Sequence, residues 1–155
     1  MRNRAAMLAG TMTTAFGPVL ACAPAAAAGA LATGGGAAVV SGTWGTAKEV
    51  PGTARLNIGQ NAAVLSVSCA TPGNCSAGGY YTDTAGHTQA FVVSETDGRW
   101  RKAIEVPGTA TLNQGGDAAV NSVSCAMAGN CAADGYYTDS SRHGHAFVVN
   151  ERPSH

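Results

Sequence analysis

The chain has 155 residues, with nine lysine and arginine residues against nine aspartate and glutamate residues, so it is formally neutral at pH 7. This length allows one domain or a few small repeats, and neutrality excludes the basic surface by which nucleic-acid-binding proteins hold phosphate. The apolar content of 45% excludes a disordered chain, because such chains combine low hydrophobicity with high net charge. We therefore expect a folded protein with no nucleic-acid partner.

The first part of the chain has the features of a secretory signal peptide. Arg2 and Arg4 form a short basic start, an uncharged apolar stretch follows, and small residues in an A-x-A pattern provide cleavage sites between residues 25 and 32. We therefore interpret residues 1–32 as a signal peptide. Residues 33–43 are then a linker rich in Gly and Ala that contains part of a strand.

Two alternatives to a cleaved signal stay open. An uncleaved membrane anchor is disfavoured because Gly10, Gly17 and Pro18 interrupt the apolar stretch. A lipid anchor would use Cys22, which follows Val-Leu-Ala, a sequence that loosely resembles a bacterial lipobox. The prediction is a secreted protein, with a lipid-anchored form on Cys22 as the alternative.

Two copies of one unit make up the rest of the chain. Five distinctive residues of the first copy recur 56 residues later without insertion: Trp44, Cys69, Cys75, His87 and Phe91. A fixed period with this similarity indicates tandem structural repeats. We therefore divide the chain into repeat 1, residues 44–99, and repeat 2, residues 100–155.

Each repeat is predicted to contain a turn and four short strands. The turn is the Pro-Gly of EVPGTA, and most of the other runs alternate in polarity as strands do. One set of predicted strands covers residues 62–69, 75–83, 89–95 and 99–106. The corresponding segments elsewhere are 118–125, 131–139, 145–151 and, with the fourth-strand pattern, 43–50. The prediction is all-β: two tandem four-stranded antiparallel blades, propeller-like, with no helix after the leader.

The phase of the repeat bears on how the blades assemble. The sequence after the leader opens with a fourth-type strand and closes with a third-type strand, the staggered arrangement by which propellers join their first and last blades. Two blades cannot close a ring, since propellers use four to eight. Three readings follow: assembly of several chains, a small eight-stranded sandwich, or a shortened relative of a longer array. Residues 37–40 look like the tail of another third-type strand, which favours the last reading.

Several segments resemble a known class of repeat. LSVSCATPGNCSAGGYYTD, QAFVVSETDGRW and AKEVPGTARLN are similar to tandem repeats in secreted actinobacterial proteins of the propeller type. Asp97-Gly98-Arg99-Trp100 lies where neuraminidase-type blades carry the Asp-box S-x-D-x-G-x-T-W, although Asp and Gly are adjacent here. The resemblance covers residues 37–155 and implies no activity. Analogy with two-blade fucose-binding lectins implies a trimer of chains and a glycan ligand.

Four cysteines form two identical C-x5-C units, one at each hairpin loop. The spacing places a cysteine at either edge of the loop, so we predict the disulfides Cys69–Cys75 and Cys125–Cys131. An even count of paired cysteines suits an exported protein. The spacing differs from the usual zinc knuckle, and we therefore expect no metal and no other cofactor.

Candidate ligand-binding residues recur in both repeats. Neighbouring tyrosines on a strand face opposite sides, so one of each pair is available for contact with a sugar or peptide. An Asp four residues before a His could orient a general base, or could simply form a polar turn. The candidates are Tyr80, Tyr81, Asp83, His87, Tyr136, Tyr137, Asp139 and His143.

No nucleophile, phosphate loop or zinc-protease motif accompanies these residues in the sequence. We therefore expect a non-enzymatic binding or surface module with a glycan or cell-envelope ligand. Its partners would be further copies of the chain or another repeat protein. The alternatives are an envelope-associated structural repeat or a truncated propeller without a ligand, and then a hydrolase that uses the Asp–His pairs.

Overall fold

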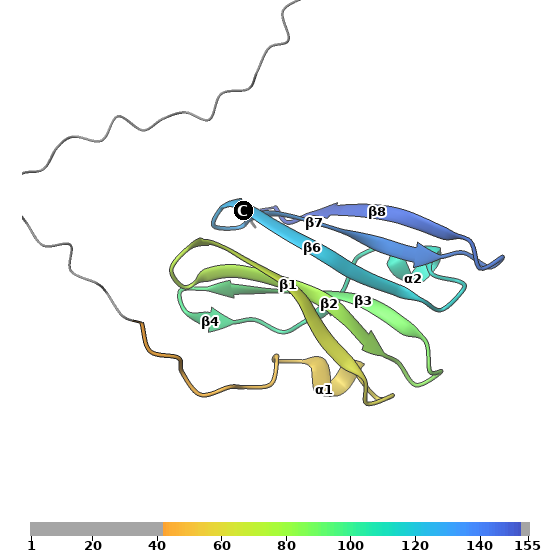
Figure 1. The fold of residues 1–155 in the computed structure, drawn as a ribbon, viewed down its shortest axis with the longest axis horizontal. Helices are drawn as coiled ribbons and strands as arrows, with labels where there is room; N and C mark the ends of the chain where they lie inside the picture. The colour runs from red at the N-terminus through yellow and green to blue at the C-terminus, as the bar shows by residue number, and fades with distance from the viewer. Residues whose placement is uncertain (1–41, 153–155) are drawn as a thin grey trace, which may run out of the picture. The chain divides into compact units, whose positions relative to one another are not determined.

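The computed structural model describes residues 42–152, and those from Trp44 onward belong to one unit (Figure 1). The predicted signal peptide, its cleavage site, Cys22 and most of the linker lie outside the described residues. Within the described part, none of the helices is long and apolar enough to span a membrane.

The first sheet, called blade 1 here, is antiparallel throughout. Short loops join its strands, so neighbours in sequence are neighbours in the sheet, in the order β1-β2-β3-β4, and β5 also pairs with β3. The Trp100 strand therefore lies at the outer edge of the sheet. The strands are β1 (Ala62–Thr71), β2 (Asn74–Thr82), β3 (Thr88–Thr96), β4 (Arg99–Trp100) and β5 (Ile104–Glu105).

The second sheet, blade 2, repeats the first three strands in the order β6-β7-β8. Its register copies that of blade 1, with Cys125 opposite Cys131 as Cys69 is opposite Cys75. The strands are β6 (Ala118–Met127), β7 (Asn130–Thr138) and β8 (Gly144–Asn150). The two antiparallel sheets confirm the all-β prediction.

Two features differ from the prediction. Residues 43–50 do not form a strand, and the segment 99–106 is divided into β4 and β5 because the backbone N–H of Ala103 donates to the carbonyl of Pro51 at 2.7 Å. Each Pro-Gly turn also continues into one helical turn, α1 (Thr53–Leu56) and α2 (Thr109–Leu112). A segment of four residues is too short to show helical periodicity, which explains why neither helix was predicted.

The hairpin turns follow from their residues. Asp97 and Gly98 have φ values of 50° and 73°, the two positive angles that a type I′ hairpin turn requires. In the sequence, Thr96-Asp97-Gly98 indicates a hairpin turn at this place, and the structure has it between β3 and β4. Gly73, with φ 75°, follows Pro72 at the tip of the β1–β2 hairpin, as in a type II turn.

The two blades stack face to face, as the layered ribbons of Figure 1 show. Side chains of both sheets form the core between them. We call the face of blade 1 that contacts blade 2 its forward face, and the opposite face its rear face, and we use the same terms for the equivalent faces of blade 2. The buried residues of this core are Ala90, Val106, Ala118, Val120, Val123, Cys131, Ala133 and Phe147.

A second core covers part of the rear face of blade 1. Val50 and Leu56, from the segment before β1, pack against it. Val50 occupies the position that Val106 occupies one repeat later. The valine before each Pro-Gly turn therefore packs on the rear face of the blade that follows it. The buried residues are Ala77, Tyr81, Phe91, Val93 and Ala103.

Candidate functional site

The predicted Asp–His pairs form the loops at one end of the blades. Oδ1 of Asp83 accepts hydrogen bonds from the backbone N–H groups of Ala85 and His87, at 2.8 and 2.9 Å. Oδ1 of Asp139 accepts the equivalent bonds from Ser141 and His143, at the same distances. An Asp that binds its own backbone two residues on builds an Asx turn. One oxygen of each carboxylate is therefore used to hold the loop.

The second oxygen of each carboxylate faces a side chain. Oδ2 of Asp83 accepts from the Gln89 amide at 2.9 Å, whereas Oδ2 of Asp139 lies 3.0 Å from Nε2 of His145. The His145 contact, together with the backbone N–H groups of the loop, lowers the pKa of Asp139 to about 2. Burial alone would raise the pKa of Asp83, but its hydrogen bonds outweigh this effect and lower it. Carboxylates of such low pKa are weak general bases at neutral pH.

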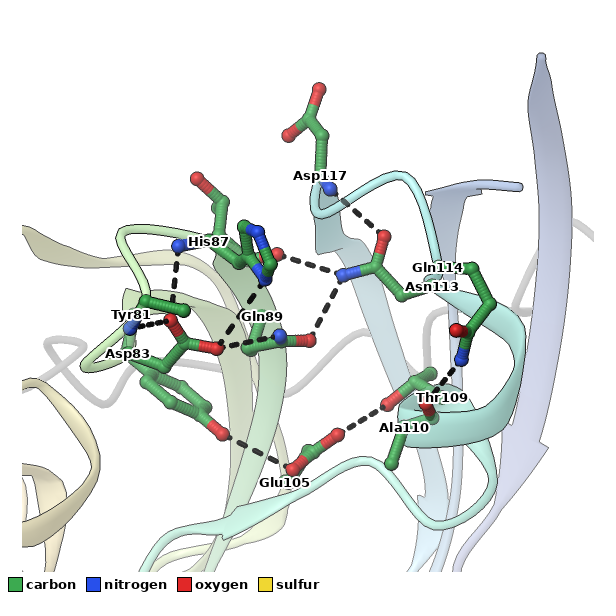
Figure 2. Close-up of polar contacts among 12 residues, drawn as sticks. Tyr81, Asp83, His87, Gln89, Glu105, Thr109, Ala110, Asn113, Gln114 and Asp117 are labelled. Carbon is green, nitrogen blue, oxygen red and sulfur yellow. Dashed lines mark hydrogen bonds and ion pairs between the residues drawn. The ribbon is translucent and has the colours of Figure 1, made fainter. Parts of the chain in front are cut away.

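A polar network connects this end of blade 1 to the start of repeat 2 (Figure 2). Nδ2 of Asn113 donates to Oε1 of Gln89 and to the carbonyl of Thr88, both at 2.9 Å. Oδ1 of the same Asn113 accepts from the backbone N–H of Asp117 at 2.8 Å. Asn113 is buried. The Asp83–Gln89 pair is thus one end of a chain of bonds that joins the two repeats.

Asn113 was not among the predicted site residues. The signal was present in the repeat, because Asn57 stands 56 residues earlier and its Oδ1 accepts the backbone N–H groups of Asn61 and Thr82 at 2.8 and 3.2 Å. An Asn that follows a predicted turn in both copies is easily taken for a loop residue. Its role becomes visible only when the strands that it joins are in place.

Three of the four candidate tyrosines make contacts within the chain. Tyr81 is buried and donates to Oε2 of Glu105 at 3.2 Å, and burial followed by the Glu105 charge raises its pKa. Tyr136 donates to Oδ1 of Asp117 at 3.0 Å, and the ring of Tyr137 stacks on His145. Tyr80 is half-buried. Three of the four tyrosine side chains are therefore engaged within the chain.

Both predicted disulfides are present. Cys69–Cys75 and Cys125–Cys131 each join residues directly opposite in a hairpin. Two intramolecular disulfides indicate an oxidising, extracellular environment.

A groove of about 590 Å³ runs along the junction of the two blades. Ser76 and Ser94 of blade 1 line one wall, and both hydroxyls donate to the Glu151 carboxylate, at 3.1 and 2.6 Å. Val123 and Ala133 of blade 2 line the other wall. This interblade groove has no aromatic side chain among its lining residues.

A second groove, of about 660 Å³, lies on the rear face of blade 1. Val64, Val67 and Glu95 line it, and these residues occupy the positions of Val120, Val123 and Glu151 one repeat later. The rear groove is therefore the counterpart of the interblade groove without the wall that a preceding blade would supply. This absence leaves Val67 58% exposed, against 8% for Val123.

Trp100 gives the rear groove a different chemistry. Trp100 lines the groove and is 38% exposed. The other lining residues include Glu49, Glu95 and Arg99, which carry charges of both signs. The recurrence of Trp after 56 residues was the available signal, but no pattern in the sequence places the ring beside these groups. The rear groove is the candidate binding site that the structure adds.

Within residues 42–152, no three His, Cys, Asp or Glu side chains are grouped so that they could hold a metal ion. The chain matches no protein-family model, and no curated protein or solved structure is significantly similar to it. What the structure supports of the propeller resemblance is two antiparallel sheets consistent with repeat blades.

Proposed function

We propose that the chain is an exported, non-enzymatic binding module and that its ligand is a carbohydrate held in the rear groove. The observation that carries this proposal is the exposed Trp100 indole beside charged groups in a groove of about 660 Å³. Binding sites for small ligands combine apolar or aromatic walls with a few polar groups that fix orientation. An indole ring supplies a large flat contact area at a low cost in conformational entropy.

The arrangement of the Asp–His pairs supports a non-enzymatic role. Nδ1 of His87 lies 4.0 Å from Oδ2 of Asp83, and Nδ1 of His143 lies 3.6 Å from Oδ2 of Asp139. Neither pair lines either groove. A hydrolase built on these pairs is the third alternative, and it predicts that His87→Ala combined with His143→Ala abolishes any hydrolytic activity that the protein shows.

A structural role without a small ligand is the second candidate. It is favoured by the equivalence of the two grooves, because the interblade groove is a by-product of blade stacking. In that case the chain is an envelope-associated repeat, or part of a longer array, and the rear face serves only to contact another blade.

A glycan array separates the two candidates. The purified protein is applied to plant, microbial and host glycans, together with the variants Trp100→Ala and Trp44→Ala. Trp44 is the matched control, because it is the same residue one repeat earlier and does not line the groove. Loss of the aromatic contact should weaken binding by up to about tenfold in Trp100→Ala only. Absence of any glycan signal for the wild-type protein would reject the carbohydrate proposal.

The mass of the protein recovered after expression tests the export part of the proposal. Cleavage between residues 25 and 32 removes Cys22, whereas lipidation of Cys22 adds acyl mass and retains the protein in membranes. An intact N-terminus in a reducing compartment would contradict both forms.

A further inference from the structure

The two blades differ in what borders their outer edge. In blade 1, β3 pairs on its outer side with β4 and β5. In blade 2, no strand within residues 42–152 pairs with the outer side of β8. Residues 44–49 have the sequence position of β4 and β5 one repeat earlier, yet they are exposed and form no strand. Within the described residues, one chain therefore presents both an unpaired strand edge and an unpaired segment of fourth-strand type.

We propose that residues 44–50 of one copy of the chain pair with β8 of a second copy and complete its blade 2. The rear face of blade 1 in the first copy then lies over the forward face of blade 2 in the second, at a wider spacing than within one chain because Asp134 stands where blade 1 has Gly78. The rear groove lies on this rear face, so a second copy and a carbohydrate would compete for it; the association itself rests on strand pairing and does not depend on the proposed function.

The register of this pairing follows from blade 1. There the N–H of Val106 donates to the carbonyl of Ala90 at 3.0 Å, and Ile104 lies opposite Val92. One repeat earlier and later, the equivalents are Val50 of one copy with Ala146 of the other, and Lys48 with Val148. The backbone of Val148 faces outward, because alternate residues of an antiparallel strand bond to the same neighbour.

The forward face of blade 2 retains the two serines whose counterparts hydrogen-bond blade 1 to blade 2 within one chain. Ser66 and Ser68 on the forward face of blade 1 accept the N–H groups of Val123 and Cys125, at 3.0 and 3.1 Å. Ser122 and Ser124 stand at the same places in blade 2 and are exposed.

Apolar surface points to the same stacking. Val148, the counterpart of Val92, is 81% exposed. On the rear face of blade 1, Val64 and Val67 are 45% and 58% exposed. Stacking of two copies would cover both surfaces, and open strand edges of this kind are what natural proteins otherwise protect.

At the centre of the proposed contact, Asp134 and Lys48 stand where blade 1 has Gly78 and Ile104. Gly78, Val92 and Ile104 form one row across blade 1. The same row in the completed blade 2 would be Asp134 and Val148 of one copy with Lys48 of the other. Strands lie about 4.8 Å apart, so the two charged side chains can meet across the valine. This exchange of Gly and Ile for opposite charges favours a second copy as the occupant.

Cross-linking of two single-cysteine variants tests the register. In a Cys22→Ser background, one chain carries Lys48→Cys and a second, of different tagged mass, carries Val148→Cys. Oxidation of the mixture should give at least about tenfold more disulfide-linked heterodimer than either variant alone gives disulfide-linked homodimer. A preference of about 1.4 kcal/mol produces this ratio.

The matched control is Val92→Cys combined with Ile104→Cys in one chain. These residues are the equivalent pair within blade 1, so an intrachain disulfide there shows that the geometry permits the bond. If the control bond forms and the mixed variants give no heterodimer, the pairing is wrong. Equal cross-linking of Val148→Cys with itself would also overturn it.

Charge reversal gives a second readout that does not depend on cysteine chemistry. Like charges across a sheet are unfavourable, so Lys48→Glu should weaken self-association about two- to fivefold, measured by sedimentation. Lys48→Glu combined with Asp134→Lys should restore it. A double variant that associates no better than the single one would exclude this contact.

Discussion

Both carboxylate oxygens of Asp139 have partners close by in the sequence. One oxygen receives two backbone N–H groups, and the other lies beside His145, with His143 at 3.6 Å. Asp83 differs only in having Gln89 where repeat 2 has His145. The repeat pattern allowed both a catalytic and a turn interpretation of these pairs, and the backbone bonds that favour the turn could be identified only from the structure.

The low pKa of Asp139 predicts a dependence of stability on acid. Its folded-state value of about 2 lies below the unfolded value of 3.8, so the ionised carboxylate adds stability above 3.8 that is lost as the pH falls towards 2. Asp139→Ala should therefore lose stability less steeply than wild type in that window, measured by urea unfolding at several pH values. His145→Gln, which places the repeat 1 residue there, should lose only part of the slope, because the backbone N–H groups of the loop still bind the carboxylate. Equal slopes for wild type and Asp139→Ala would contradict the assignment.

At the scale of the element, the first hairpin of each blade depends on a glycine within its second strand. A Cβ atom built on Gly79 would overlap the carbonyl oxygen of Ala63, and Gly135 has the same relation to Ala119. Both lie beside the register shift in the first hairpin of their blade. Backbone cannot move aside as a flexible side chain can, so these positions exclude any larger residue.

Gly79→Ala should therefore reduce the free energy of unfolding by about 1–3 kcal/mol or more, as overpacking of a closed site does. Gly144→Ala is the matched control, because Gly144 also lies in a strand but has no atom within 4 Å of its added Cβ. Chemical denaturation of the two variants measures the difference. Similar stability for both would show that the β1–β2 hairpin is looser than described.

The disulfides stabilise the same hairpins by restricting the unfolded chain. Replacing Cys125 and Cys131 with Ala should lower the free energy of unfolding by about 2–2.5 kcal/mol, the value expected for so small a closed ring. Denaturation of the variant measures this loss. Reduction of the wild-type protein breaks both disulfides, so a loss about twice as large would support the ring-closure origin, whereas no loss in either case would contradict it.

The strands were predictable because repetition, alternation and turn residues all pointed to the same positions. The exception is the fourth strand, which sequence alone extends over residues 99–106. In the structure the N–H of Ala103 bonds to Pro51 instead of β3. The partner of such a group depends on tertiary structure, and no local pattern within the strand reveals it.

At the scale of the whole molecule, one glycine sets the distance between the blades. A Cβ atom on Gly78 would lie 2.5 Å from Cγ1 of Val120, which is fully buried. The equivalent position in blade 2 is Asp134, on the exposed forward face. The candidate rear groove shows the same dependence on context, because its residues are repeats of buried ones and become a site only where no blade covers them.

Gly78→Asp should therefore separate the blades and destabilise the protein by at least about 3 kcal/mol, since it adds both bulk and an unpaired charge to the core. Asp134→Ala should change stability by less than about 0.5 kcal/mol, because its site faces solvent in the single chain. Thermal unfolding at low protein concentration compares the two. A stable Gly78→Asp variant would contradict the described stacking.

Head-to-tail pairing of copies is the central claim about the molecule, and native mass in solution tests it most directly. The wild-type oxidised protein should form a discrete species larger than one chain as its concentration rises. Val148→Pro should remain a folded monomer, because proline is tolerated at a strand edge but removes the outward N–H. A well-folded wild-type protein that keeps the mass of a single chain at every concentration would contradict the account.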